Sequence, residues 1–463
     1  MVATPKPKDA NQAESTSRIV WQLAWPAVAL NSMQVINTLL DRFFIGHLRD
    51  SALTAHGAAT TVMFMMFSMA VALGTGVTAI VARAYGAKNR TEVRRANRQG
   101  FRLCVISGII LAILTATFSR SVAVAILPAK ATEAVDQMTL FCQAYAAGLP
   151  AICMIQCLAG SLRGTGDTKS PMVISGIQIV IHMILNTILI PRLGLVGAGI
   201  SLSISATLAA LVYVPYVSRT PLGPVHHLRL PQKDWVVRIL RIAFPAGTMA
   251  ALRVLSLTAF TVALKLAPNG EAAIAAMGIG FAIESVMFMP SFGLSVAAGA
   301  LVGQSLGAQD PDRAYRIGWT ASHWAGLVTV VLAFPIFIFA PNIANVMLAG
   351  KPTIITEAVS LLRWLCVTEV FFAYSMVLIG ALQGAGDTVR PMRIAIFALW
   401  GMRVPLAFIL LLPRGFPIYG WALPIGAGMG AAGAWVAMSF TQFVQGVLSV
   451  IAWKRGAWRT LKV

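Results

Sequence analysis

Charged residues are scarce in this chain, and acidic residues are the scarcest. Charged residues make up 11% of the 463 residues against 57% hydrophobic ones, and only 16 residues are Asp or Glu. A soluble globular protein is typically about a quarter charged, so this composition excludes a water-soluble fold. The apolar runs are about 18 to 30 residues long, and a helix needs about 20 residues to cross a hydrocarbon core, so each run predicts a membrane span.

Motifs of catalysis, metal binding and secretion are also missing. The sequence has no Gly-rich phosphate loop, no G-x-S-x-G elbow and no H-E-x-x-H helix, which argues against an enzyme. The five cysteines fall inside apolar runs without C-x-x-C spacing, so we expect no disulfide framework, no metal site and no cofactor. Residues 1–17 are polar and lack the apolar core of a secretory signal, which predicts a polar cytoplasmic tail.

The formal net charge of +20 has an explanation other than nucleic-acid binding. If the N-terminus is cytoplasmic, most of the 36 lysines and arginines fall on the cytoplasmic side of the predicted spans. The positive-inside rule therefore predicts that both termini are cytoplasmic. Positive charge on that side also suits an anionic cytoplasmic leaflet, so no nucleic-acid partner is expected.

The apolar runs predict an all-α integral membrane protein with twelve transmembrane helices. The predicted spans lie near 18–46, 53–82, 101–127, 136–162, 171–191, 196–217, 238–265, 272–304, 316–347, 355–382, 391–412 and 419–452.

The chain also contains an internal repeat. The segment GSLRGTGDTKSPM at 160–172 returns as GALQGAGDTVRPM at 380–392, with eight of the thirteen positions identical. The repeated unit is six spans, so both copies have the same orientation and should be related by a pseudo-two-fold axis along the membrane normal, with a cavity between them. The predicted organisation is a cytoplasmic tail, an N-lobe, a cytoplasmic linker, a C-lobe and a basic cytoplasmic tail, at 1–17, 18–217, 218–237, 238–453 and 454–463.

The repeated G-x-G-D-T loops are interpreted as turns and not as phosphate cradles, because the Lys-Ser/Thr of a nucleotide loop does not follow them. Gly164 and Gly166 permit a tight turn, Asp167 can cap the next helix, and Pro171 suits its first turn. We expect the same roles in the second copy for Gly384, Gly386, Asp387 and Pro391.

Ionisable residues inside spans are the strongest functional signal, because a charge in hydrocarbon costs at least a few kcal/mol. Asp41 in the first span lies on a polar stripe with Asn31, Gln34 and Asn37. A second stripe, in the fifth span, repeats every four residues at Gln178, His182 and Asn186. Converging stripes would form a wet pocket around one carboxyl group that binds and releases a proton. The alternative is that Asp41 forms a salt bridge with its neighbour Arg42 or ends the helix.

The second half carries a different set of charges. The position that corresponds to Asp41 is Phe260, so the acid is not duplicated. Four ionisable residues lie within its spans instead, namely Arg253, Glu284, Glu369 and Arg403. They form either a structural charge network, which we favour, or a substrate site, and we expect Arg253 to pair with Glu284.

These features together resemble the multidrug and toxic compound extrusion (MATE) family. The resemblance rests on the paired G-x-G-D-T loops, the stretch LLDRFFIGHL around Asp41, GVTAIVARAYGA, and IESVMFMPSFGLSVAAGALVGQSLGA. It implies a cation-coupled antiporter whose N- and C-lobes alternate between inward-open and outward-open states, with Asp41 as the coupling residue. Two positions depart from the family pattern: many members have an aspartate near Asn186, and some have a glutamate near Arg253.

The function expected from the resemblance is export of amphipathic organic compounds in exchange for H+, with Na+ as the alternative coupling ion. Asp41, Asn37 and Asn186 are the expected coupling residues. The expected substrate cavity contains Gln34, Gln178, His182, Arg253, Glu284, Glu369 and Arg403. We expect a monomer in a bacterial inner (plasma) membrane. A lipid-linked precursor flippase of the same wider superfamily is the alternative function, and Arg253 and Arg403 would suit its pyrophosphate head group.

Overall fold

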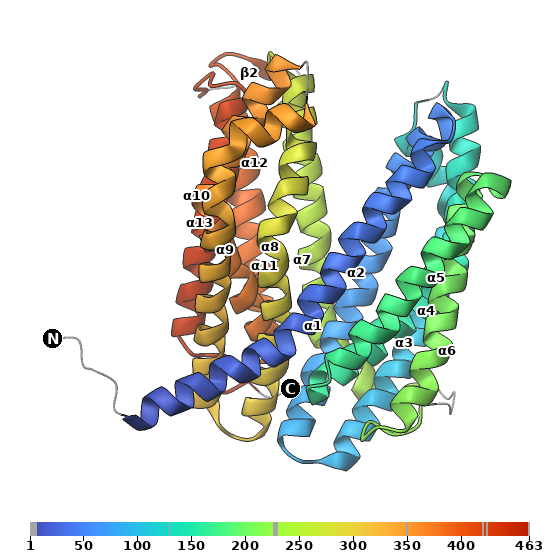
Figure 1. Ribbon diagram of the computed structural model, residues 1–463, viewed down its shortest axis with the longest axis vertical. Helices are drawn as coiled ribbons and strands as arrows, with labels where there is room; N and C mark the ends of the chain where they lie inside the picture. The colour runs from blue at the N-terminus through green and yellow to red at the C-terminus, as the bar shows by residue number, and fades with distance from the viewer. Residues whose placement is uncertain are drawn as a thin grey trace. The chain divides into compact units, whose positions relative to one another are not determined.

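The protein folds almost entirely into helices (Figure 1). The structure is a computed structural model that describes residues 7–128, 130–225, 230–348, 351–418, 421–422 and 425–461. Within these residues, twelve helical segments are long and apolar enough to cross a membrane, which confirms the predicted all-α membrane fold.

The helices of the first half are α1 (Pro7–Gly46), α2 (Asp50–Gly86), α3 (Arg90–Ile126), α4 (Thr132–Thr165), α5 (Lys169–Leu193) and α6 (Leu195–Ser218). Those of the second half are α7 (Lys233–Lys265), α8 (Gly270–Gly307), α9 (Pro311–Met347), α10 (Pro352–Gly384), α11 (Val389–Ala395), the π-helix η1 (Ile396–Arg403), α12 (Val404–Leu411) and α13 (Ala431–Lys454).

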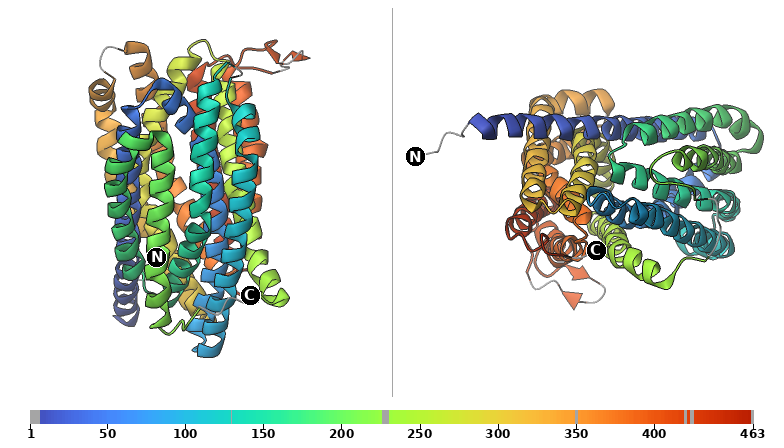
Figure 2. Two further views of the ribbon diagram at one scale, coloured as in Figure 1. Left: turned by 90° about the vertical axis from the view of Figure 1, so that its right-hand side faces the viewer. Right: turned by 90° about the horizontal axis from the view of Figure 1, so that it is seen from below.

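The predicted twelfth span begins too early. It was expected from residue 419, but α13 begins at Ala431, and a short hairpin of β1 (Pro417–Ile418) and β2 (Trp421–Ala422) precedes it beyond the ends of the neighbouring helices (Figure 2). Gly428 and Gly430 have φ angles of 64° and 61°, which glycine adopts readily and other residues avoid. The segment is apolar, but its glycines prevent it from continuing the helix.

The eleventh span is a helix with a widened middle turn. The predicted range 391–412 is divided between α11, η1 and α12, and Pro405 stands at the start of α12. Proline lacks an amide N–H and its ring clashes with the carbonyl four residues earlier in a regular α-helix. A π-helical turn relieves that clash, and such turns are frequent at functional sites. Arg403 is the last residue of η1.

Both predicted tails are more ordered than expected. Helix α1 begins at Pro7, because proline is compatible with the first turn of a helix, so much of the segment 1–17 is helical. At the other end Trp458 is fully buried, and its ring stacks on Trp453 with 4.1 Å between the centroids. The indole N–H of Trp458 donates to the carbonyl of Trp453 over 3.0 Å. The segment after α13 is therefore packed onto the protein.

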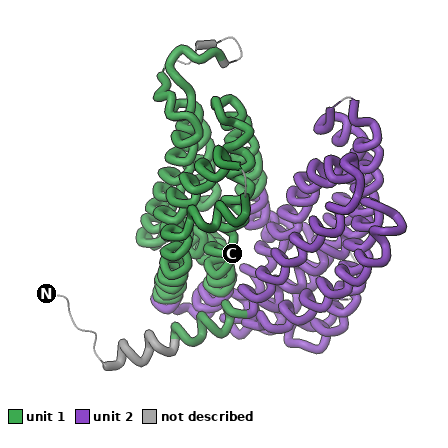
Figure 3. The backbone as a smooth tube through the Cα atoms, turned by 45° about the horizontal axis from the view of Figure 1, so that its top comes forward, with its two compact units in different colours: residues 1–25, 248–299, 315–461 green, residues 26–247, 300–314, 462–463 purple. Residues whose placement is uncertain are grey.

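Two compact units make up the chain (Figure 3). Unit 1 comprises residues 1–25, 248–299 and 315–461, and unit 2 comprises residues 26–247, 300–314 and 462–463. The units are interleaved in the sequence, because the ends of α1, α7, α8 and α9 divide between them. The predicted lobes 18–217 and 238–453 remain a prediction.

Helix α4 is central to unit 2, where it contacts α2, α3 and α6. Its buried residues Leu149, Leu158 and Leu162 belong to one apolar core with Tyr213 of α6. Cys153 and Cys157 are free thiols that pack in the same core. The segment between α6 and α7 also packs here, since Leu222 and Val225 are buried. In unit 1, α10 packs on α13 around a core that includes Trp435, Phe260 and Leu361.

The two repeated loops form the same helix-ending turn, as predicted. Gly166 and Gly386 have φ angles of 93° and 85°, and the amide of the following aspartate donates to the carbonyl of Leu162 or Leu382. This hydrogen-bond pattern is a Schellman motif. The side chain of Asp167 then accepts from the amide of Ser170 over 3.0 Å, and so caps α5.

Gly164 and Gly384 have a role that the sequence interpretation missed. They lie inside α4 and α10, and they are needed for close helix packing and not for the turn. A Cβ atom at Gly164 would lie 3.1 Å from the carbonyl oxygen of Thr78, and one at Gly384 would overlap the carbonyl oxygen of Gly299. Each glycine therefore lets the backbones of two helices touch.

Replacing Gly384 by alanine is expected to destabilise the protein by about 1–3 kcal/mol or more, because α8 and α10 must separate to admit the methyl group. Gly278→Ala in α8 is the matched control, since nothing lies within 4 Å of its added Cβ. Thermal unfolding of both variants in detergent checks this prediction. Equal melting temperatures for the two would show that the contact is not tight.

Candidate functional site: a hydrogen-bonded carboxyl group between α1 and α5

Asp41 of α1 lies against the polar face of α5 in unit 2. Its Oδ1 atom is 2.7 Å from Nδ2 of Asn186 and 3.0 Å from Nε2 of His182. Its Oδ2 atom accepts a longer hydrogen bond of 3.3 Å from Nδ2 of Asn37, one turn earlier in α1. The Asp41 side chain is 20% exposed, whereas that of His182 is 4% exposed. The structure thus brings together four predicted residues.

His182 can act as either a donor or an acceptor in this cluster. Its Nε2 atom lies within hydrogen-bonding distance of both Asp41 and Asn186, at 3.0 and 3.1 Å. If Asp41 is ionised, Nε2–H donates to the carboxylate; if Asp41 carries a proton, its O–H donates to Nε2. The same heavy-atom positions therefore suit both protonation states of Asp41.

Several polar atoms around Asp41 have no partner. Among the described residues, Oδ1 of Asn37, Oδ1 of Asn186 and Nδ1 of His182 are buried without a hydrogen bond. A buried polar atom left unpaired costs about 1–3 kcal/mol. Water or a polar ligand could satisfy these atoms, and the wet pocket stays a prediction.

The other predicted members of this site lie outside the cluster. Gln34 is exposed and Gln178 is half-buried, and the described residues include no hydrogen bond from either side chain to Asp41. They also include no ion pair between Asp41 and the exposed Arg42, which leaves the salt-bridge alternative without support. His56 of α2 was missed: it interacts electrostatically with Asp41, but no polar stripe like those of the first and fifth spans was recognised around it.

The four charged residues of the second half also come together, in unit 1. Glu284 of α8 and Glu369 of α10 are both buried. Their carboxyl groups interact electrostatically, and neither Oε atom of Glu369 has a hydrogen-bond partner among the described residues. Arg403 interacts electrostatically with both Glu284 and Arg253.

The expected pair of Arg253 with Glu284 is wrong. Glu284 accepts instead from Nε2 of Gln442 over 3.1 Å, and Oε1 of Gln442 accepts from the hydroxyl of Thr368 over 2.9 Å. Arg403 donates from Nε to the hydroxyl of Thr441 over 3.0 Å. The sequence interpretation missed these neutral partners, although Thr441 and Gln442 were visible as adjacent polar residues within an apolar span.

Comparison with known families decides the identity. The MatE family model matches residues 26–188 and 245–409, which together are well over half of the chain. The chain belongs to the MatE family. One match falls within each predicted half, in agreement with the internal repeat. The family places the chain among membrane transporters and not among enzymes.

Relatives of this MatE protein match over nearly their whole lengths. It is 27% identical over 448 residues to the probable multidrug resistance protein NorM of Thermotoga maritima, covering 94% of this chain and 92% of the relative. It is 28% identical over 432 residues to the multidrug resistance protein MdtK of Photorhabdus laumondii, covering 91% of each.

Solved structures show the same fold. An outward-facing multidrug resistance MATE family transporter matches with a TM-score of 0.87 at 20% identity, over 96% of this chain and 97% of that one. A transporter of the same superfamily from Pyrococcus furiosus matches with a TM-score of 0.84 at 20% identity, over 96% of this chain and 97% of that one.

Replacing Gln442 of this MatE protein by leucine is expected to lower its stability by about 1–3 kcal/mol, because Glu284 and Thr368 lose their buried partner. Gln445→Leu is the matched control on the same helix: Gln445 is also buried, but its Nε2 atom has no hydrogen-bond partner in the described part of the chain. Thermal unfolding in detergent compares the two variants. If Gln445→Leu is as destabilising as Gln442→Leu, the hydrogen-bond network is not the cause.

Proposed function

We propose that this protein exports amphipathic organic compounds, cationic or polyaromatic ones in particular, in exchange for protons across a bacterial inner membrane. Asp41 is the coupling residue in this proposal, and both termini are cytoplasmic. The names of the full-length relatives support multidrug export. The arrangement of Asp41, His182 and Asn186 supports the choice of coupling residue.

Coupling requires that Asp41 binds a proton with different affinity in different states of the transporter. Deprotonated Asp41 accompanies bound substrate, and protonation from the outside releases the substrate and permits the return to the inward-open state. Every hydrogen bond that Asp41 accepts favours its ionised form. A movement of α1 past α5 that lengthens the 2.7 Å contact with Asn186 would therefore favour proton uptake.

The choice of H+ over Na+ as the coupling ion is part of the proposal. Asn37 and Asn186 both donate amide N–H groups to Asp41, and these hydrogen bonds support a carboxyl group that exchanges a proton. The described residues also include no group of three or more His, Cys, Asp or Glu side chains arranged to hold a metal ion.

The flippase alternative is not favoured. Arg253 and Arg403 were the residues that would suit a pyrophosphate head group, but Arg403 is engaged by Thr441 and lies close to Glu284. The relatives are named as multidrug resistance proteins.

In proteoliposomes, the rate of transport driven by a pH gradient is expected to be at least about tenfold lower for Asp41→Asn than for the wild type, because asparagine cannot exchange a proton. Transport of a fluorescent cationic dye is measured under a pH gradient and, in a separate experiment, under a sodium gradient. Wild-type protein is expected to respond to the pH gradient alone.

Asp50→Asn is the control, because Asp50 is an exposed acid at the start of α2 that should leave transport unchanged. Full pH-driven transport by Asp41→Asn would contradict the proposed coupling. Transport driven by sodium alone would contradict the choice of ion.

A further inference from the structure

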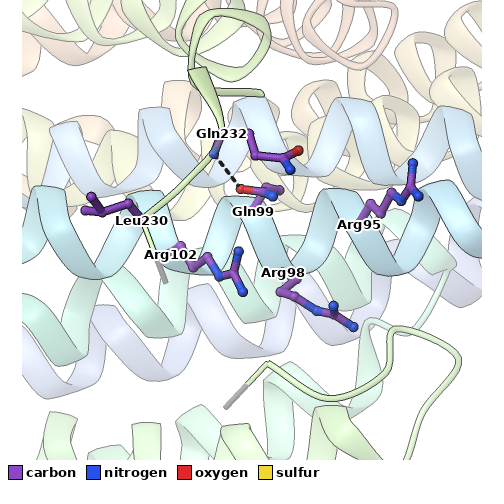
Figure 4. A pocket seen from close by; sticks show the side chains of 6 residues that line it. All are labelled: Arg95, Arg98, Gln99, Arg102, Leu230 and Gln232. Atoms are coloured by element: carbon purple, nitrogen blue, oxygen red, sulfur yellow. Dashed lines mark hydrogen bonds between the residues drawn. The ribbon is translucent and has the colours of Figure 1, made fainter. Parts of the chain in front are cut away.

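A cationic pocket lies near the N-terminal end of α3 (Figure 4), and its lining includes none of the residues of the Asp41 cluster. Its volume is about 390 Å³, within the range of small-ligand sites. It is lined by Arg95, Arg98, Gln99, Arg102, Leu230 and Gln232.

The three arginines share one face of α3. Arg95, Arg98 and Arg102 are three and four positions apart, the spacing that places side chains on the same side of a helix. The opposite wall is the segment before α7, which is held to α3 by a hydrogen bond of 3.0 Å from the amide of Gln232 to Oε1 of Gln99 (Figure 4). Arg102 and Gln99 are buried, so packing fixes the floor of the pocket.

Among the described residues, the lining contains three arginines and no acid. The nearest acid along α3 is Glu92, which is already paired with Arg238 over 2.7 Å. Nε of Arg98 is buried and has no hydrogen-bond partner among the described residues. An anion with several acceptor oxygens would supply a negative charge beside the exposed Arg95 and the acceptor that Nε of Arg98 lacks.

We propose that this pocket binds the phosphate group of an anionic phospholipid. The guanidinium group of arginine can donate two parallel hydrogen bonds to the oxygens of a phosphate. A basic pocket at the end of a membrane-spanning helix lies at the depth of lipid head groups. Leu230 at the rim is apolar and 82% exposed, a suitable contact for the glycerol and acyl part of a lipid but not for free phosphate. The bound lipid would clamp α3 to the segment that leads into α7.

Lipid retention by the purified protein, measured by native mass spectrometry, tests the proposal. Phosphatidylglycerol, phosphatidylcholine and inorganic phosphate are offered separately to the full chain in detergent. The wild-type protein is expected to retain phosphatidylglycerol over phosphatidylcholine. Arg98→Gln and Arg95→Gln are each expected to weaken that retention about fivefold, which is the effect of one basic residue near an anionic lipid surface.

Arg90→Gln is the matched control, because it removes the same charge from an exposed position of α3 outside the pocket. If Arg98→Gln does not fold, the exposed Arg95 still provides an interpretable variant. Equal retention of both lipids, or an equal loss in Arg90→Gln, would overturn the proposal. Displacement of phosphatidylglycerol by inorganic phosphate at equal concentration would assign the pocket to free phosphate and overturn the lipid assignment.

Discussion

A carboxyl group inside a membrane protein must find hydrogen-bond donors, and this requirement organises the site around Asp41. The free-energy cost of an isolated charge in hydrocarbon is large enough that helix packing must provide partners for it. Helix α5 provides them with His182 and Asn186, one turn apart and both buried. Helix α1 adds Asn37. The hydrogen bonds of this one side chain therefore fix how α1 packs against α5.

The two ionisable clusters differ in the partners that they provide for charged side chains inside the membrane. The cluster in unit 2 has one acid among a histidine and two amides, so the arrival or departure of a proton changes its hydrogen bonding directly. The cluster in unit 1 has two acids and two arginines, with Gln442 and Thr441 as neutral partners. The structural charge network that the sequence favoured for this cluster stays a prediction. Phe260 occupies the position of the second half that corresponds to Asp41.

The sequence predicts the helices well because twenty apolar residues have few alternatives in a membrane. It predicts the Asp41 cluster because two stripes with helical spacing mark the faces that must meet. It fails where composition does not determine the backbone. The strands β1 and β2 and two glycines with positive φ precede α13, and the π-helix η1 precedes Pro405 in the eleventh span. The partner of Glu284 could not be predicted either. Opposite charge favoured Arg253, but the helix packing places the amide of Gln442 next to Glu284.

Proton release on substrate binding tests the central claim most directly, because exchange at Asp41 requires that substrate and proton lower each other's affinity. The measurement adds substrate to purified protein in weakly buffered detergent solution and follows the pH. The account predicts that the wild-type protein and Asp50→Asn release protons as substrate binds, and that Asp41→Asn binds substrate without release. Undiminished proton release from Asp41→Asn would contradict it.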